Sequence, residues 1–402
     1  MRIAILTLAA LSLAVGGAAA AIYFVDAAGT GDYATIQAAV NAVSANSIIE
    51  LAEGTYTGAG NRDIDFLGKA LTIRSASGRP ASCVIDCQGA GRGFNFHTAE
   101  TGASVVKGLT VRNGYAADYG GGVYCSGASP SILNCVIADC EAEVRGGGIY
   151  GVNAQPTVNN CVISGNTAQY GGGVAYWSQG GHFWNDLFTG NSADYGDAVY
   201  LSGPDIYVRS CTFDTNYGRN YDSALYGASG GGFTITNSIV WNNDGYPMIR
   251  NAVVSYSCIY GDGFSGTGNI DANPQFASGP AGGWYLATTS PCVSTGSAAA
   301  SAVAFTAGDG TVAMSRLTTR ADETNDSGTV DMGYHHGHAN IIYVPDRYGT
   351  IQAALDNAFS GERVVVRDGN YYERVDFHGR AIELASEHGV SVTRIGGTGA
   401  GS

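Results

Sequence analysis

Four polar residues lie near one another in the sequence and have side chains that can act as acids, bases or charge stabilisers. They are Asp194, Asp197, Arg219 and Asp222. Paired carboxylates hydrolyse glycosidic bonds, whereas a Lys or Arg base assisted by Ca²⁺ splits uronate polymers by elimination. Solvated carboxylates at turns explain the same residues more simply. Whether the chain is an enzyme therefore stays open, and a Ca²⁺-assisted polysaccharide lyase is the enzymatic hypothesis.

A second set of candidate residues is aromatic. In short β-strands every second side chain points outward, and parallel rungs lie about 4.8 Å apart. Tyrosines that recur in each repeat would then form a strip of rings, suited to stacking on sugars or on a protein partner. The alternative is a tyrosine ladder that only stabilises itself. The candidate ligand-binding residues are Tyr124, Tyr150, Trp177, Trp184, Tyr200 and Tyr226.

A third set consists of possible metal ligands. Asp322, Asp326 and Asp331 lie in Gly-containing turns, whose oxygen atoms suit Ca²⁺. The segment His335-His336-Gly337-His338 has a His-x-His spacing but no obvious further ligands for a transition metal. No cofactor is expected, with Ca²⁺ as the one ion that the sequence would accommodate.

Repeated phrases show which elements must position these residues. Related segments, most of them containing a Gly triplet, begin at Tyr119, Arg145, Tyr170, Tyr195 and Tyr221, at intervals of 26, 25, 25 and 26 residues. A fixed period in this range indicates a solenoid, in which each coil is stable only against its neighbours. A second phrase would stack its Asn residues in a column of hydrogen-bonded turns. These are Asn166, Asn191 and Asn216.

The chain has 9 cysteines, so at least one has no partner within the chain. Cys135, Cys161 and Cys211 occupy one position of the repeat, where Asp186 replaces the cysteine of the coil between the last two. This regularity predicts a column of buried thiols, although neighbouring rungs would also permit a Cys135–Cys161 disulfide. Cys83 and Cys87 are predicted as the more favourable local pair.

Composition limits the possible partners. The sequence of 402 residues carries a formal net charge of −14, and Lys69 and Lys107 are its only lysines. Nucleic acids and anionic membranes require a basic surface, so neither is expected as a partner. A polyanionic polysaccharide would also be repelled unless a cation bridged the charges.

The first 20 residues are typical of a secretory signal peptide: Arg2 precedes a short apolar run, and small residues end the segment. No other apolar run approaches the length of a membrane span. We therefore expect an exported protein, secreted or at the cell surface, with no transmembrane segment after removal of the signal.

The segment that follows predicts a cap for the open end of the solenoid. Residues 22–25 and 48–51 have strand patterns, and residues 33–45 form an amphipathic helix by their spacing. The run Gly31 to Val40 together with Glu53-Gly54-Thr55-Tyr56 resembles the opening of pectin methylesterases and other pectin-lyase-like proteins. The resemblance implies an all-β, right-handed parallel β-helix with about 25 residues per coil and a short N-terminal capping helix.

The repeats themselves carry a second resemblance. The Gly-Gly-x-aliphatic and Phe-x-x-Asn phrases are similar to the repeats of chlamydial polymorphic outer-membrane proteins and related bacterial surface β-helices. Motifs of the enzymes with this fold, such as the Gly-x-x-Asp-Phe-Ile-Phe-Gly phrase of pectin methylesterases, are not completed: Gly328-Thr-Val-Asp331 begins like it but continues differently. The likeness therefore extends to the scaffold and not to an active site.

Four segments follow from these patterns. They are a signal peptide (1–20), a β-helix (21–296), a closing module or linker (297–340) and the start of a second, truncated β-helix (341–402). The last segment repeats the first cap at a constant offset of 315 residues, as from Ile36 to Ile351 and from Tyr56 to Tyr371.

The sequence thus favours an exported bacterial β-helix that acts as a binding, adhesion or structural module. Its expected partner is a polysaccharide or surface glycan, or else another protein. The alternative is a polysaccharide lyase or glycoside hydrolase on the same scaffold.

Overall fold

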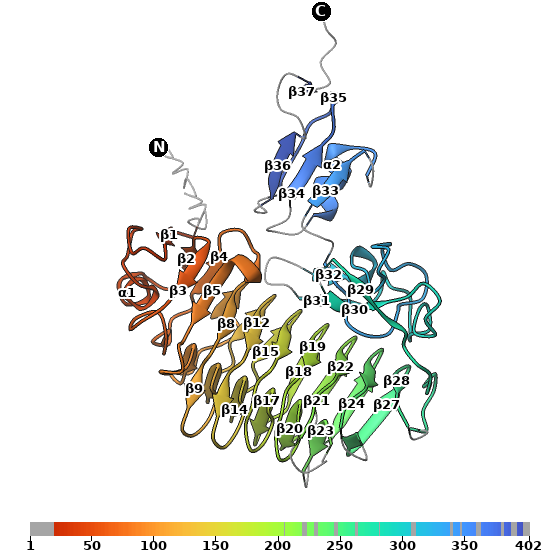
Figure 1. The fold of residues 1–402 in the computed structure, drawn as a ribbon. Helices are drawn as coiled ribbons and strands as arrows, with labels where there is room; N and C mark the ends of the chain where they lie inside the picture. Colours follow the sequence, from red (N-terminus) through yellow and green to blue (C-terminus); the bar gives the residue numbers. More distant parts are fainter. Residues whose placement is uncertain are drawn as a thin grey trace, which may run out of the picture.

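The chain winds through three parallel β-sheets, one strand of each per regular coil (Figure 1). The computed structural model describes residues 20–396 apart from 205, 219–222, 229–231, 245–247, 262–263, 281, 307–310, 338–340, 346–347, 359–362, 379–381 and 387–391. All strand pairs within the three sheets are parallel, as in the pairs of β10 with β14, β11 with β15 and β12 with β16. This confirms the predicted all-β solenoid.

The strands are short because each spans only one side of a coil. Sheet A contains β1 (Ile22–Val25), β2 (Ile48–Leu51), β4 (Thr72–Ser75), β7 (Val105–Lys107), β11 (Ser131–Leu133), β15 (Thr157–Asn159), β18 (Gly181–Trp184), β21 (Ile206–Arg209), β24 (Phe233–Thr236) and β27 (Ala252–Ser255). Sheet B contains β3 (Gly54–Tyr56), β5 (Cys83–Asp86), β8 (Thr110–Arg112), β12 (Val136–Ala138), β16 (Val162–Ser164), β19 (Leu187–Thr189), β22 (Thr212–Asp214), β25 (Ile239–Trp241) and β28 (Cys258–Ile259). Sheet C contains β6 (Phe94–Phe96), β10 (Val123–Ser126), β14 (Ile149–Val152), β17 (Val174–Trp177), β20 (Val199–Ser202), β23 (Leu225–Gly227) and β26 (Ile249–Arg250). Between sheets B and C lie the short strands β9 (Tyr115–Ala116) and β13 (Glu141–Ala142).

The core lies inside the coils, where the inward side chains of all three sheets meet. Ile137, Val158 and Phe188 are among the fully or almost fully buried apolar residues of this single cluster. Each coil adds one layer to the cluster, so the core grows in length and not in thickness.

The N-terminal end of this core is covered by α1 (Ile36–Ala42). Thr35 caps the helix by accepting a hydrogen bond from the backbone N of Ala38, and Ile36, Ala39 and Val40 are buried. The helix is shorter than the predicted 33–45 because Thr35 and Val43 both have extended backbone angles that end it. A 3₁₀ turn, η1 (Pro80–Ser82), precedes β5.

Two columns of polar side chains fix the corners of the coils. At the corner between sheets B and C, Asn166, Asn191, Asn216 and Asn243 are buried, and each accepts a hydrogen bond from the backbone N of the preceding coil. Asn side chains also bond one another, as from Asn191 Nδ2 to Asn216 Oδ1 at 2.9 Å. The predicted Asn column is confirmed.

The corner between sheets A and B holds the other column. Cys135, Cys161, Asp186 and Cys211 lie one above another, continued by Ser238, and all are buried. The backbone N of each coil donates to the side chain of the next, for example from Cys161 to Asp186 Oδ1 at 2.7 Å. The predicted thiol column is therefore confirmed.

The predicted Cys83–Cys87 disulfide is wrong: both are free thiols, and the thiol that interacts with Cys83 is Cys135, whereas the one that interacts with Cys87 is Cys140. Both side chains lie fully buried in the main core, as small apolar fillers. Cys135 and Cys161 are likewise unlinked: the Cys161 sulfur accepts a hydrogen bond from the Cys135 backbone N.

The Gly triplets serve the corner that leads into sheet C. Gly146 has a left-handed φ of 64°. A Cβ on Gly147 would lie 2.4 Å from the carbonyl oxygen of Thr167 in the next coil, which no side chain tolerates. The triplet is thus required by the close stacking of successive coils.

After the last coil the chain turns back along the solenoid. We name residues 276–337 the covering segment; it contains β29 (Phe276–Gly279), β30 (Gly282–Leu286), β31 (Ala304–Thr306), β32 (Thr311–Ala313) and η2 (Met314–Arg316). It lies against the corner between sheets A and B: the backbone N of His335 donates to Asn185 Oδ1, and that of Tyr334 donates to Thr212 Oγ1. Its two strand pairs are antiparallel hairpins, unlike the coils.

Residues 341–396 repeat the beginning of the chain. They contain β33 (Ile341–Val344), α2 (Ile351–Asn357), β34 (Arg363–Val366), β35 (Gly369–Tyr372), β36 (Glu383–Ser386) and β37 (Thr393–Gly396), with a separate apolar cluster. Thr350 caps α2 through the backbone N of Ala353, as Thr35 caps α1. The internal repeat of the sequence therefore corresponds to a repeated strand–helix–strand cap. Within the described part of the chain, no helix is long and apolar enough to cross a membrane.

Candidate functional site

The outer face of sheet C carries one aligned column of side chains. Tyr124, Tyr150, Ala175, Tyr200 and Tyr226 are paired in register on neighbouring strands. The preceding residue on each strand, such as Val123 or Ile149, faces the core. Strand alternation therefore places this column outside, as the sequence indicated.

A second column runs beside the first. Tyr119, Arg145, Tyr170 and Tyr195 precede the glycines and are linked by successive parallel bridges. The rings of the two columns contact one another: Tyr119 stacks on Tyr150 with centroids 4.8 Å apart, and Tyr170 meets Tyr200 edge to face at 5.1 Å. Further along, Tyr200 stacks on Tyr226 at 5.4 Å.

Three arginines are inserted among these rings. The guanidinium of Arg145 lies 4.3 Å from the ring centroid of Trp177 and 5.4 Å from those of Tyr119 and Tyr170. Arg92 lies over Tyr124 at 5.3 Å, and Arg250 over Tyr226 at 5.0 Å. We name this surface the aromatic strip; it consists of Arg92, Tyr119, Tyr124, Arg145, Tyr150, Tyr170, Trp177, Tyr195, Tyr200, Tyr226 and Arg250.

The positive charges of the strip are only partly neutralised by the protein. Arg92 pairs with Asp118. No carboxylate among the described residues forms an ion pair with Arg145 or Arg250. Arg145 Nε is buried without a hydrogen-bond partner, and the guanidinium lies over the faces of three aromatic rings. The strip is thus a basic and aromatic surface on an acidic protein.

Accessibility differs along the strip. Tyr150 and Tyr200 are only 4% and 7% exposed, because neighbouring rings cover them. Burial raises the pKa of Tyr150 to about 12 and raises that of Tyr200 as well. Tyr124, Trp177 and Tyr226 keep partly exposed rings. The two buried rings match the self-stabilising ladder, and the outer rings provide the surface that a ligand can reach.

Trp184 is not part of the strip. It lies on β18 in sheet A, where it packs against the apolar cluster of the covering segment that contains Phe305 and Met314. The guanidinium of Arg209 lies over its ring at 5.1 Å. Trp177 and Trp184 are close in sequence, but the corner between sheets C and A separates their faces. The predicted position of Trp184 in one site with Trp177 is therefore wrong.

The four catalytic candidates do not form a described site. Asp197 is fully buried, and its Oδ1 accepts a hydrogen bond from the backbone N of Ala193 at 3.3 Å. A side chain in this position does not reach a polymeric substrate. Asp194 lies in a partly exposed turn. Arg219 and Asp222 lie outside the described residues.

The metal-ligand candidates are divided between two environments in the covering segment. Asp322 pairs with Arg320 at the surface, at 2.5 Å. Asp326 Oδ2 accepts hydrogen bonds from His335 Nε2 at 2.8 Å and from the backbone N of Asp331 at 3.0 Å. Within the described ranges, no three His, Cys, Asp or Glu side chains come together as metal ligands.

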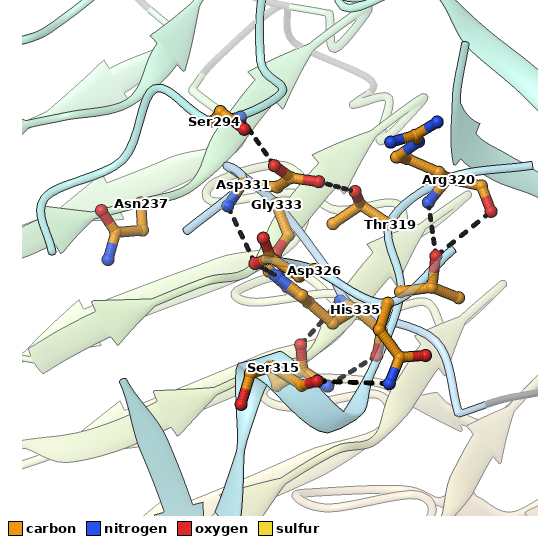
Figure 2. A network of polar contacts seen from close by, with 12 residues as sticks. Asn237, Ser294, Ser315, Thr319, Arg320, Asp326, Asp331, Gly333 and His335 are labelled. Carbon is orange, nitrogen blue, oxygen red and sulfur yellow. Dashed lines mark hydrogen bonds and ion pairs between the residues drawn. The ribbon is translucent and has the colours of Figure 1, made fainter. Parts of the chain in front are cut away.

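Asp331 extends this buried network. Its carboxylate accepts hydrogen bonds from the backbone N of Ser294 and from the hydroxyl of Thr319 (Figure 2). Burial, followed by the negative charge of Asp326, raises the pKa of Asp331. The network joins distant parts of the covering segment, and its side chains are enclosed, which is the arrangement of a structural element.

The neighbouring histidines are also used in packing. His336 stacks on Tyr285 with ring centroids 3.7 Å apart, and burial lowers its pKa to about 4. His335 Nδ1 contacts the carbonyl oxygen of Gly333 at 2.9 Å. The hypothetical metal cluster of these residues is not formed here, while His338 lies outside the described residues.

Sequence reasoning missed half of the strip. Tyr119, Tyr170, Tyr195 and Arg145 were visible as the first residues of the repeated phrases, at the same spacing as the recognised tyrosines. Their neighbourhood depends on how the backbone turns through the glycines, which residue spacing alone does not give. Arg92 and Arg250 lie in coils that lack the phrase, so no sequence pattern marks them.

Comparisons with known proteins give one family match and several weak structural similarities. Residues 93–272 match the family described as right handed beta helix region. Pectate lyase Pel9A is 15% identical, with 77% of this chain and 98% of that chain covered and a TM-score of 0.39. A pectin methylesterase from carrot is 13% identical, with 58% and 87% covered and a TM-score of 0.32.

A third solved structure, the PL6 family alginate lyase AlyGC, is 13% identical, with 93% of this chain and 68% of that chain covered and a TM-score of 0.30. Similarities at these TM-scores say nothing about activity. The comparison with curated proteins gives no match. The parallel coils and the matched region show that the chain contains a right-handed parallel β-helix.

Proposed function

We propose that the protein binds carbohydrate through the aromatic strip and acts as an exported surface or matrix module. The observation that supports this most directly is the alternation of partly exposed rings with guanidinium groups that have no carboxylate partner, as at Trp177 and Arg145. The column runs along the axis of the solenoid, so it offers a linear polymer equivalent contacts at successive coils.

Both kinds of side chain suit a sugar. The C–H face of a pyranose ring is apolar and stacks on an aromatic face, which removes apolar surface of both from water. A guanidinium presents several N–H donors in a fixed plane to hydroxyl or carboxylate oxygens. Arg145 is held between Trp177 and two tyrosines, so little conformational freedom remains for it to lose on binding.

The charge of the whole chain selects among glycans. A formal net charge of −14 repels a polyanion at long range, whereas the arginines of the strip attract acidic groups at contact. Exposed charges are screened beyond about 8 Å at physiological ionic strength. Neutral glycans, or glycans with sparse acidic sugars, therefore satisfy both conditions best.

Export is part of the same proposal and is supported by the sequence of residues 1–20, which lie almost entirely outside the described structure. A surface glycan is available only to a protein that leaves the cytoplasm. An exported location is therefore consistent with a surface glycan as the ligand. Fractionation of cells that produce the full chain tests whether the protein is exported.

The binding test uses a glycan array with the full chain, followed by calorimetry on the best ligand. Trp177→Ala is expected to weaken binding about tenfold, which corresponds to about 1.4 kcal/mol. Tyr207→Ala is the matched control: Tyr207 is 41% exposed on sheet A and stacks on His182, away from the strip. An equal loss in both variants, or no glycan bound by the folded protein, would contradict the proposal.

The enzymatic alternative is examined with the same glycans. Elimination in a uronate polymer gives an unsaturated sugar that absorbs in the ultraviolet, with or without added Ca²⁺. Product that accumulates with the wild-type chain would replace the binding module by a lyase. Trp177→Ala then shows whether the strip holds the substrate.

A further inference from the structure

The nine cysteines fall into two groups by their position in the fold. Seven of them lie in the main core inside the coils: Cys83, Cys87, Cys125, Cys135, Cys140, Cys161 and Cys211. Cys258 and Cys292 instead belong to a separate apolar cluster between the solenoid and the covering segment. The position of these two thiols therefore calls for its own explanation.

Strand alternation explains why Cys258 faces the covering segment. In β28 it pairs with Ile239 of β25, whereas its neighbour Ile259 pairs with Val240. Val240 and Ile259 point into the main core, while Ile239 and Cys258 point out of it. Cys258 is thus an outward residue of the last coil that the following chain buries: its sulfur donates to the carbonyl oxygen of Ala272 at 3.1 Å, and it shares a cluster with Met332 of the covering segment.

Cys292 belongs to the covering segment and is buried in the same apolar cluster as Cys258. It lies in the turn after β30, where its backbone N donates to Ser290 Oγ at 3.1 Å and its carbonyl oxygen accepts from the backbone N of Met332 at 2.9 Å. The second of these bonds holds the turn against the segment that contains Met332. Cys258 and Cys292 share one apolar cluster, in which their side chains interact, and both are fully buried.

We propose that Cys258 and Cys292 are oxidised to a disulfide in the exported protein, which links the last coil of the β-helix covalently to the covering segment. The bond joins two pieces of structure that are otherwise held by packing and hydrogen bonds. The proposal is independent of what the aromatic strip binds.

The oxidant is a disulfide, either a small molecule such as oxidised glutathione or a protein disulfide. The thiolate of Cys258 attacks one sulfur of the oxidant, whose other sulfur leaves as a thiolate and takes up a proton. Cys292 then loses its proton and attacks the Cys258 sulfur of the mixed disulfide, which releases the second thiol of the oxidant. Two cysteine thiols thus lose two electrons and two protons, and the oxidant disulfide becomes two thiols.

The acidity of the thiols agrees with this order of attack. The hydrogen bond from Cys292 lowers the pKa of Cys258 in spite of its burial, while the same contact raises that of Cys292. Burial alone raises the pKa of the interior thiols, for example to about 11 at Cys135 and about 12 at Cys140. Thiolates are the reactive form, so the interior group is inert by comparison.

Timing follows from burial. Neither sulfur is accessible in the folded protein, so the oxidant reacts before the covering segment packs on the last coil, or when the segment opens transiently. Once formed, the disulfide is shielded in the same way from reductants in solution. The predicted bond is therefore slow to form in the folded reduced protein and slow to be reduced.

Peptide mapping of the full chain tests the proposal directly. The reduced protein is refolded with oxidised glutathione, its remaining thiols are alkylated in denaturant, and a protease digest is analysed by mass spectrometry without reduction. We expect seven alkylated cysteines and one linked peptide pair that contains Cys258 and Cys292. Nine alkylated cysteines, or a different pair such as Cys83 with Cys87, would overturn the proposal.

Thermal unfolding gives a second measurement with matched variants. Because the bond closes a loop of about 35 residues, reduction of the wild type is expected to lower its apparent melting temperature by roughly 5–10 °C. Cys258→Ser should abolish this shift, and Cys125→Ser, in the interior group, should keep it. A shift that persists in Cys258→Ser would contradict the assignment even where the mapping is incomplete. If Cys258→Ser does not fold, the mapping of the wild type decides alone.

Discussion

Two arginine–tryptophan pairs on different faces of the solenoid show how the proposed binding surface differs from a packed one. Arg145 lies 4.3 Å from the ring centroid of Trp177 on the outer side of sheet C. Arg209 lies 5.1 Å from that of Trp184 on sheet A. The chemistry of the two pairs is the same, but Trp184 packs against the covering segment, whereas Trp177 belongs to the aromatic strip. The two pairs therefore differ in whether the covering segment lies on them, and not in the types of their residues.

The two faces also differ in the groups whose ionisation they control. On the side of the covering segment, burial raises the pKa of three carboxyls, those of Asp186, Asp214 and Asp331. On the strip, burial raises the pKa of Tyr150 and Tyr200. The covered side is therefore expected to respond to pH in the acid to neutral range, and the strip only at strongly alkaline pH.

The largest effect is expected where the covered side holds the buried hydrogen bond between Asp326 and His335. Asp326→Ala removes the hydrogen-bond partner of His335. Both side chains are fully enclosed, so water cannot replace the lost partner. Leaving the buried His335 ring without this acceptor costs about 1–3 kcal/mol, the desolvation penalty of an unsatisfied polar group. Urea unfolding measures the loss, and glycan binding by the folded fraction should be unchanged because the strip lies on the other face.

Asp322→Ala is the control for this variant. Asp322 pairs with Arg320, but their side chains are 40% and 26% exposed. An exposed pair contributes about 0–1 kcal/mol, so this variant should unfold close to the wild type. If Asp326→Ala and Asp322→Ala lose the same free energy of unfolding, the enclosed network contributes no more to stability than the exposed pair. A loss of glycan binding by folded Asp326→Ala would show that the two faces are coupled.

A smaller effect is expected from the carboxyl within the thiol column. Asp186→Ser introduces the residue type that Ser238 has in the same column. Burial raises the pKa of Asp186 well above its usual value of 3.8. The variant should gain stability relative to the wild type as the pH rises, by about 1.4 kcal/mol for each unit by which the pKa is raised.

The sign follows from proton binding. As the pH rises above 3.8, the unfolded chain releases the proton of Asp186 first, while the folded chain retains it. The wild type therefore loses stability with rising pH until the raised pKa of the folded state is passed, and Asp186→Ser removes this loss. Urea unfolding between about pH 4 and about pH 8 measures the difference, with exposed Asp244→Ser as the control. A difference that does not change with pH would contradict the assignment.

The repeat explains why much of this architecture could be predicted and part of the site could not. The period of the phrases placed Tyr124, Tyr150, Tyr200 and Tyr226 on one face, because register in a solenoid follows from spacing. The corner columns of Asn and Cys follow in the same way. The covering segment has no period, so neither the burial of Trp184 nor the pairing of Asp326 with His335 could be predicted from the sequence.

The next effect concerns the strip itself. Arg145→Ala removes a guanidinium that contacts three rings, and Arg209→Ala removes the equivalent group from Trp184. Arg145→Ala should weaken glycan binding by about 0.5–2 kcal/mol, or about 2-fold to 30-fold. Arg209→Ala should leave the affinity unchanged in calorimetry. An equal loss in both variants would remove the functional distinction between the two faces.

The smallest effect on glycan affinity is expected from removing the Tyr150 hydroxyl while keeping the ring. Tyr150→Phe keeps the stacking with Tyr119 and Tyr124 at centroid distances of 4.8 and 5.8 Å but removes the phenol, whose pKa burial raises to about 12. Because Tyr150 is almost covered, its hydroxyl has little access to a ligand, and affinity should stay within about twofold, that is within about 0.4 kcal/mol. Tyr150→Ala should instead lower both stability and binding, because the rings of Tyr119 and Tyr124 lose their support. If Tyr150→Phe alone abolishes binding, the phenol contacts the ligand, and the strip opens further in solution than its stacked arrangement implies.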